Sequence, residues 1–152
     1  MITKYIKDDI TKTELKYIAH GVNSMNVMGA GVAKSIYEAF PEVKERYHGY
    51  ASQYQGSSYN QKMLLGDVQS VKTKGKVIYN CFTQLNYGRD GKRYVNYKAI
   101  VDCFKALSET LEGEILAIPK IGSGLANGNW EFIEQLINDT IEDKLEVWVY
   151  EL

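Results

Sequence analysis

Two glycine-rich breaks, each placed between an apolar run and an amphipathic stretch, constrain the fold of this chain most strongly. The second break has glycines at 122, 124 and 128, follows the apolar run 114–118 and precedes an amphipathic stretch that begins at Trp130. The first break, 28–33, follows the apolar run 16–22. Glycine permits positive φ and close approach, and a helix N-terminus adds a favourable dipole, so each break can present bare N–H groups to an anion. Two such loops predict a ligand with more than one phosphate or sugar group.

The order of apolar runs and helical spacings predicts an α/β fold. Strands are expected at 16–22, 64–71, 77–82, 114–118 and 145–150, and helices at 30–40, 42–53, 97–111 and 130–141. Strands that alternate with helices favour a layered fold with a largely parallel sheet, in which ligands bind beyond the carboxyl ends of the strands. Both glycine breaks lie at such ends. No linker or internal repeat divides the sequence, so we expect one domain over 1–152.

Composition excludes several classes of protein. The 152 residues are 45% apolar and 24% charged with a net charge of −1, which gives no basic footprint for bulk nucleic-acid binding. The sequence has no signal-peptide pattern and no apolar run of membrane-spanning length. Its two cysteines, Cys81 and Cys103, fit neither a disulfide framework nor a metal site. We therefore expect a cytoplasmic protein without membrane attachment, metal or cofactor.

Three polar residues beside these segments are candidates for chemistry or binding. His20 lies within the apolar run 16–22, where a pKa near neutrality would suit proton transfer; a buried histidine bonded to a neighbouring group explains it equally well. Asp90, in the polar loop after 77–82, is a candidate partner for His20 or activator of water, and an ordinary Asp-Gly turn is the competing interpretation. Asn23, at the end of the first run, could bond a sugar hydroxyl or form a turn.

Four blocks of this sequence resemble the macrodomain family in order and spacing. They are Asp8–Lys12, Ile18–Asn23, Met28–Ile36 and Ile118–Leu125, and together they span nearly the whole chain. Macrodomains are three-layer α/β/α modules that bind ADP-ribose or its derivatives. The resemblance therefore implies that fold, with a mixed and mostly parallel central sheet, and ADP-ribose or ADP-ribose 1″-phosphate as the small-molecule ligand.

The resemblance also assigns parts of this ligand to particular residues. Asp9 would accept a hydrogen bond from the adenine amino group, and Ile10 would lie beside the base. Asn23 would bond the distal ribose, and Tyr150 is a candidate for stacking on adenine. The two glycine loops would wrap the distal ribose and the two phosphates through Met28, Gly29, Ala30, Gly31, Val32, Ile121, Gly122, Ser123, Gly124, Leu125, Ala126 and Asn127.

Within the family, the chain is most similar to a branch of small, stand-alone members that includes ADP-ribose 1″-phosphate phosphatases and a deacylating terminal ADP-ribose hydrolase. His20, the block Asn80–Gln84 and the segment 124–130 carry this similarity. The chain departs from the common motif at His20, where that motif has asparagine. It departs from the deacylating hydrolases at Thr83–Gln84 and at Ala126, where they have a lysine and an aspartate. The second departure counts against a mechanism through a lysine adduct.

Three functions are compatible with these residues. The leading hypothesis is hydrolysis of ADP-ribose 1″-phosphate, with His20 as general acid/base or as nucleophile and Asp90 as its partner. The second is a hydrolase that removes ADP-ribose from modified protein or nucleic acid, with water attacking the distal C1″; Lys92 and Arg93 are left open as stand-ins for the missing lysine. The third is a non-catalytic reader of ADP-ribose. All three use one cleft. ADP-ribosylated macromolecules are further candidate partners, and we expect a monomer.

Overall fold

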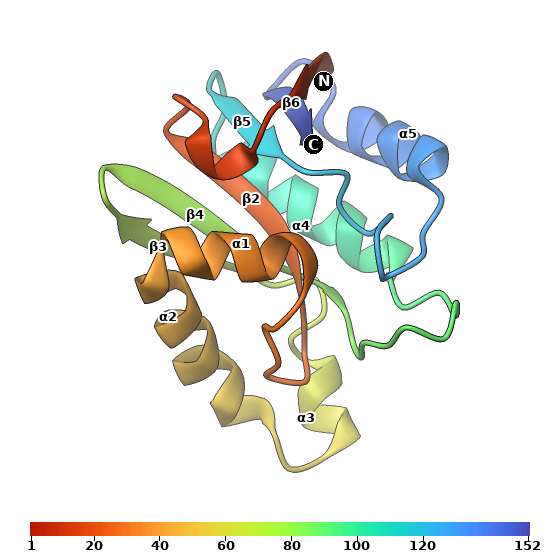
Figure 1. The fold of residues 1–152 in the computed structure, drawn as a ribbon. Coiled ribbons are helices and arrows are strands. Elements are labelled where there is room, and N and C mark those ends of the chain that lie inside the picture. The colour runs from red at the N-terminus through yellow and green to blue at the C-terminus, as the bar shows by residue number, and fades with distance from the viewer.

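A computed structural model describes residues 1–152, and its centre is a six-stranded sheet (Figure 1). The strand order is β1-β6-β5-β2-β4-β3, and the strands are β1 Ile2–Lys7, β2 Tyr17–Asn23, β3 Val68–Thr73, β4 Lys76–Gln84, β5 Ile115–Ile118 and β6 Glu146–Glu151. Neighbouring strands pair in parallel, except that β3 pairs antiparallel with β4 at one edge. The expected mixed and mostly parallel sheet is therefore confirmed.

Helices cover both faces of this sheet (Figure 1). One face carries α1 (Gly31–Ala39) and α2 (Pro41–Ala51), and the other carries α4 (Tyr97–Thr110) and α5 (Trp130–Ile141). Shorter helices lie in the connections: η1 (Ile10–Lys12), η2 (Ser52–Tyr54) and α3 (Ser58–Lys62). The expected three-layer α/β/α arrangement is confirmed. No helix is both long and apolar enough to cross a membrane.

Alternate residues of the central strands face the two helical layers. In β2, Ile18 packs in the same cluster as Ile36 of α1, whereas the next residue, Ala19, packs with α4 and α5. In β4, Ile78 packs in the cluster that contains Ile36 of α1, and the next residue, Tyr79, packs in the cluster of α4 and α5. A strand covered on both faces buries every side chain, which explains why β2 and β4 appear in the sequence as nearly continuous apolar runs.

Two regions differ from the sequence prediction. β1 was not expected, because only Ile2 and Ile6 of this edge strand are partly buried, and its place is fixed by parallel pairing with β6. The strand expected at 64–71 begins only at Val68, because the chain turns at 64–67, where Asp67 N donates to Leu64 O at 2.9 Å. Neither difference affects the strands that carry the glycine loops.

The topology of the connections predicts a ligand-binding crevice at the carboxyl edge of the sheet. β2 and β5 are parallel neighbours, paired at Tyr17–Leu116 and Ile18–Ala117. The chain leaves β2 toward α1 on one face and leaves β5 toward α5 on the other. Where neighbouring parallel strands continue to opposite faces, a crevice forms between their carboxyl ends, and ligands of open α/β sheets bind there. The two glycine breaks are these two connections.

Candidate functional site

The first glycine loop joins β2 to α1 and leaves its backbone donors free. No side chain caps α1 at Ala30, and the N–H groups from Gly29 to Ala33 donate to no acceptor within the protein. Gly31 has a φ of +61°, in the left-handed region that glycine adopts without strain. Gly29, Gly31 and Val32 are exposed. A helix N-terminus with unsatisfied donors is a favourable place for an anion.

Side chains hold this first loop in shape. Asn23 Oδ1 accepts from Met25 N at 3.0 Å, and Asn23 Nδ2 donates to Val27 O at 2.7 Å. From α2, the buried Tyr47 donates its hydroxyl to Asn23 O at 2.7 Å. Burial raises the pKa of Tyr47, so this hydroxyl stays a donor at neutral pH. Asn23 therefore shapes the loop, and the second N–H of its Nδ2 has no acceptor within the protein.

The second glycine loop joins β5 to α5 and is held by its own backbone. Gly128 N donates to Gly122 O at 2.7 Å, which closes the loop on itself. A Cβ on Gly128 would lie 2.6 Å from Gly122 O, and Gly122 has a φ of +79°, so both positions require glycine. Four N–H groups donate to no acceptor within the protein, those of Gly122, Gly124, Leu125 and Ala126. The second loop thus offers a further set of donors across the crevice from the first.

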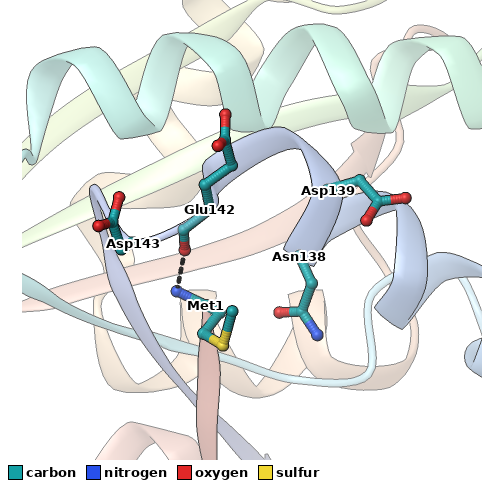
Figure 2. Close-up of a pocket in the computed structure, with 5 residues that line it drawn as sticks. All are labelled: Met1, Asn138, Asp139, Glu142 and Asp143. Atoms are coloured by element: carbon teal, nitrogen blue, oxygen red, sulfur yellow. Dashed lines mark hydrogen bonds between the residues drawn. The ribbon is translucent and has the colours of Figure 1, made fainter.

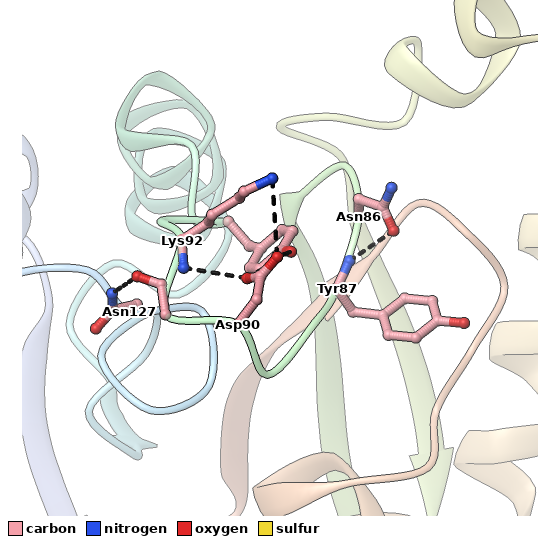
Figure 3. A network of polar contacts seen from close by, with 7 residues as sticks. Asn86, Tyr87, Asp90, Lys92 and Asn127 are labelled. Carbon is pink, nitrogen blue, oxygen red and sulfur yellow. Dashed lines mark hydrogen bonds and ion pairs between the residues drawn. The ribbon is translucent and has the colours of Figure 1, made fainter.

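A third segment, 85–95, follows β4 and docks on the second glycine loop (Figure 3). Tyr94 N donates to Ala126 O at 2.8 Å, and the side-chain amide of Asn127 donates to Gly91 O. Asp90 accepts from Lys92 N at 3.1 Å and from the Tyr94 hydroxyl at 2.9 Å. These donors lower the pKa of the exposed Asp90, which is ionised at neutral pH.

His20 lies inside the protein, below the first glycine loop. It has no exposed surface, and its Nε2 is 2.6 Å from Asn80 Oδ1. The amide Nδ2 of Asn80 donates to Gln69 Oε1 at 3.1 Å, so Asn80 Oδ1 faces His20 and the Nε2 of His20 is the donor. Burial lowers the pKa of His20 to about 4, so the imidazole is neutral at pH 7. The remaining nitrogen, Nδ1, has no hydrogen-bond partner.

The structure does not join the two proposed catalytic residues. His20 is bonded to Asn80 inside the sheet layer, whereas Asp90 is bonded to Tyr94 and Lys92 on the surface. No hydrogen bond connects them. The geometry favours a positioning role for His20 beneath the loop and leaves Asp90 at the rim of the crevice.

The residues expected at the adenine end lie at the ends of β1 and β6. Asp9 Oδ1 accepts from Thr11 N at 2.9 Å and from Thr11 Oγ1 at 2.8 Å, and these bonds lower the pKa of Asp9. Its second oxygen, Oδ2, forms no hydrogen bond within the protein and is left as an acceptor. Ile10 and Tyr150 are each only 6% exposed, and the Tyr150 hydroxyl is 2.6 Å from Thr13 Oγ1. Tyr150 therefore packs under η1, where it has little ring surface for stacking on a base.

Two supporting residues were missed by sequence reasoning. Tyr47 is one of several tyrosines in the stretch 47–59, and nothing in the sequence links it to Asn23. Asn80 could have been found, because it is the polar residue in an apolar run that parallels the run around His20. The two residues are direct partners in the β2–β4 register.

A hollow elsewhere on the surface is separate from this site (Figure 2). Its lining consists of Met1, Asn138, Asp139, Glu142 and Asp143. The N-terminal amine donates to Glu142 O at 2.6 Å. Because β1 and β6 begin at this end, the hollow lies at the amino edge of the sheet, opposite the glycine loops. No group of three or more His, Cys, Asp or Glu side chains in the protein is arranged to hold a metal ion.

Comparison with known proteins identifies relatives along the whole chain. An uncharacterized 17.5 kDa protein of Enterobacteria phage T4 is 34% identical, and the match covers 97% of this chain and 94% of the phage protein. The human ADP-ribose glycohydrolase OARD1 is 27% identical, with 97% and 90% covered. An ADP-ribose 1″-phosphate phosphatase of Debaryomyces hansenii is 24% identical, with 96% and 98% covered.

Solved structures and the family model agree with these relatives. A Bacteroides thetaiotaomicron protein of unknown function has a TM-score of 0.83 at 28% identity, with 100% of this chain and 98% of that chain covered. The macrodomain of Thermus aquaticus DarG has a TM-score of 0.78 at 21% identity, with 100% and 99% covered. The model of the Macro domain family matches residues 19–137, which include most of β2, both glycine loops and most of α5. The chain therefore belongs to the macrodomain family.

Proposed function

We propose that this protein binds ADP-ribose derivatives across its carboxyl-edge crevice and hydrolyses ADP-ribose 1″-phosphate to ADP-ribose and phosphate. The observation that carries the proposal is the pair of glycine loops, which both carry free N–H groups and follow neighbouring parallel strands. The named relatives that are hydrolases support the class of reaction.

The order of the strands gives the bound ligand a direction. Asp9 follows β1, the second glycine loop follows β5, the first follows β2, and segment 85–95 follows β4. In this order the adenine would lie near Asp9 and Ile10, and the two phosphates would lie against the glycine loops. The distal ribose would then extend toward β4, where Asn23 and segment 85–95 meet it. The free Oδ2 of Asp9 suits an adenine amino group, because an ionised carboxylate only accepts hydrogen bonds.

Hydrolysis of a phosphate monoester needs an activated water and stabilisation of the charge on the transferring group. Backbone N–H groups fixed before the reaction can supply that stabilisation, since phosphoryl transfer depends mainly on positioning and electrostatics. Asp90 is ionised and lies at the β4 end of the crevice, where it would orient the attacking water. His20 would be a positioning residue. Its hydrogen bond to Asn80 of β4 holds the part of β2 that leads into Asn23 and the first loop.

Removal of ADP-ribose from a modified macromolecule is the second candidate function. It uses the same crevice, with water attacking C1″ of the distal ribose instead of phosphorus. The human relative named as an ADP-ribose glycohydrolase favours this candidate. The absence of a lysine at Thr83–Gln84 counts against the lysine-adduct form of that reaction. The cytoplasmic location and the monomeric state expected from the sequence stay predictions under either function.

Phosphate release from ADP-ribose 1″-phosphate, measured together with ADP-ribose binding by calorimetry, tests the proposal. We expect release by the wild-type protein and a loss of most of the rate in Asp90→Asn with ADP-ribose affinity retained. His20→Gln should lower rate and affinity together, because it disturbs the strand below the first loop. Binding of ADP-ribose without phosphate release would overturn the phosphatase and favour de-ADP-ribosylation. A rate lost in His20→Gln at unchanged affinity would instead give His20 a direct part in proton transfer.

A further inference from the structure

The border of the crevice is basic although the protein as a whole is weakly acidic. Three segments surround it: 23–35, 85–95 and 119–129. Together they carry five basic residues and one acidic residue, a net +4, whereas the whole chain carries −1 and the rest of it therefore −5. The six charged residues are Lys34, Arg89, Asp90, Lys92, Arg93 and Lys120. A basic border on an acidic protein attracts anionic ligands specifically to this crevice.

The free positive charge is concentrated in segment 85–95. Lys34 and Lys120 are paired with acidic residues, with their Nζ atoms 4.0 Å from Glu38 and 2.9 Å from Glu151. By contrast, Arg89 is exposed and forms no hydrogen bond or ion pair.

The other two cations of the segment are partly engaged. Lys92 Nζ lies 3.8 Å from Asp90, and the Arg93 guanidinium lies 4.5 Å from the ring centre of Tyr97. The carboxylate of Asp90 (Figure 3) also accepts a hydrogen bond from the Tyr94 hydroxyl. Arg89 is thus the cation of this segment that is free to bind an external anion.

The strand order places segment 85–95, which carries Arg89, beyond both glycine loops. β4 lies on the far side of β2 from β5, so segment 85–95 is at the opposite end of the crevice from Asp9. The segment is fixed there, because Tyr94 N and Val95 N both donate to Ala126 O, at 2.8 and 3.2 Å. The glycine loops already supply backbone donors for two phosphates. An anion that meets Arg89 would therefore be a third anionic group, attached beyond the distal ribose.

We infer that Arg89 is a specificity-determining residue that binds a phosphate monoester on the distal ribose, so that the site prefers ADP-ribose 1″-phosphate to ADP-ribose. The inference rests on the proposed function, since it takes the orientation of ADP-ribose from it. A guanidinium suits this role because its planar donors match phosphate oxygens in pairs. Lys92 and Arg93 raise the local positive potential and help to draw the ligand to this end.

Affinities for ADP-ribose and for ADP-ribose 1″-phosphate, measured for the same set of variants, test the inference. The set is the wild-type protein, Arg89→Ala, Arg89→Lys and the control Lys105→Ala, which removes one exposed positive charge from α4 away from the crevice. Calorimetry gives Kd for ADP-ribose, and also for ADP-ribose 1″-phosphate where no phosphate is released. Where a variant releases phosphate, the release assay gives KM and kcat/KM instead. An unmodified single-stranded oligonucleotide is the third ligand.

We expect Arg89→Ala to weaken binding of ADP-ribose 1″-phosphate about tenfold, which corresponds to about 1.4 kcal/mol, and that of ADP-ribose less than about twofold. Arg89→Lys should give an intermediate loss, and Lys105→Ala should change neither affinity. Equal effects on the two ligands, or no effect, would overturn the inference while leaving ADP-ribose binding intact. Loss of oligonucleotide binding in Arg89→Ala would also overturn it, because the cation would then serve a polynucleotide. If the wild-type protein did not bind ADP-ribose, the proposed function would fail first, and the inference with it.

Discussion

The two glycine loops face the same crevice, but they are built by different means. The loop after β2 is held by side chains, since Asn23 bonds it from within and Tyr47 bonds it from α2. The loop after β5 is held by its own backbone. Gly128 must be glycine because of its close contact with Gly122 O, and Gly122 must be glycine because of its positive φ and its closeness to the Val95 side chain. The first loop therefore depends on atoms that a substitution can remove. The second depends on empty space that a substitution can fill.

The largest effect is expected from filling that space with Gly128→Ala. The added Cβ would lie 2.6 Å from Gly122 O and 2.6 Å from Val95 Cγ1, so the backbone of the second loop must move. Overpacking of this kind costs roughly 1–3 kcal/mol, and we expect a loss near the upper end, about 3 kcal/mol, in the free energy of unfolding. ADP-ribose affinity should fall more than about tenfold, because the free N–H groups move with the loop. Urea unfolding and calorimetry measure the two effects.

Gly124→Ala in the same loop is the matched control. A Cβ at Gly124 would meet no atom within 4 Å, and Gly124 is not in the left-handed region. Its free energy of unfolding should change by less than about 0.5 kcal/mol. A similar loss in both variants would show that the second loop does not depend on the close contact at Gly128.

The next largest effect is expected from His20, which lies in the strand that leads into the first loop. It is a dependence of the free energy of unfolding on pH. His20 has a pKa of about 4 in the folded protein and an ordinary value of 6.5, so the unfolded chain binds more protons between these two pH values. The contribution of His20 to the free energy of unfolding is therefore constant above pH 6.5. As the pH falls from 6.5 to 4, the free energy of unfolding decreases, by about 3 kcal/mol at most. Urea unfolding at pH 7 and at pH 4.5 should show a markedly smaller loss in His20→Gln than in the wild-type protein.

His48→Gln provides the comparison for this prediction. His48 is partly buried on α2, and burial also lowers its pKa, but it retains contact with water. Its replacement should change the acid sensitivity less than His20→Gln does. Equal acid sensitivity of the wild-type protein and His20→Gln would contradict the assignment of His20 as a neutral, enclosed residue.

The sequence predicts the fold better at its centre than at its edges. β2, β4, β5 and β6 were found because strands buried on both faces are apolar throughout, and α5 was found at Trp130–Ile141 from its spacing. β1 was missed because an exposed edge strand needs no apolar pattern and is fixed by its partner β6. Local periodicity records burial, so it cannot report an element whose position depends on pairing alone.

The sequence predicts the parts of the candidate site that are formed by the backbone, and it does not predict the side chains that support them. Both glycine loops were located from their composition, because the positive φ of Gly31 and Gly122 and the close contact at Gly128 require glycine. The environment of His20 was only narrowed to two alternatives, since the sequence does not show whether a histidine in an apolar run titrates near neutrality or is bonded to a buried neighbour. Tyr47 was unpredictable for a related reason: its partner, the carbonyl of Asn23, is distant in sequence and has no side-chain signature.

Tyr47→Phe removes a single atom from the support of the first loop. The substitution leaves Asn23 O without its buried hydroxyl donor, so we expect a loss of about 1–2 kcal/mol in the free energy of unfolding. ADP-ribose affinity should fall a few-fold, because the first loop becomes less fixed. Tyr59→Phe is the control, since Tyr59 is 74% exposed and its hydroxyl forms no hydrogen bond. If the two variants were equally stable, the first loop would not depend on its side-chain anchor.

The smallest effect tests the side-chain bond that ties the second loop to segment 85–95. Asn127 donates its amide to Gly91 O and has a φ of +57°, which glycine also adopts without strain. Asn127→Gly therefore removes the bond to segment 85–95 without straining the backbone, and we expect a loss of less than about 1 kcal/mol because the bond is exposed. Hydrogen exchange at the amides of Tyr94 and Val95, which donate to Ala126 O, should become faster, while exchange at Gly128 should not change. Faster exchange at Gly128 as well would mean that the second loop and segment 85–95 open together, so that the backbone alone does not hold the second loop.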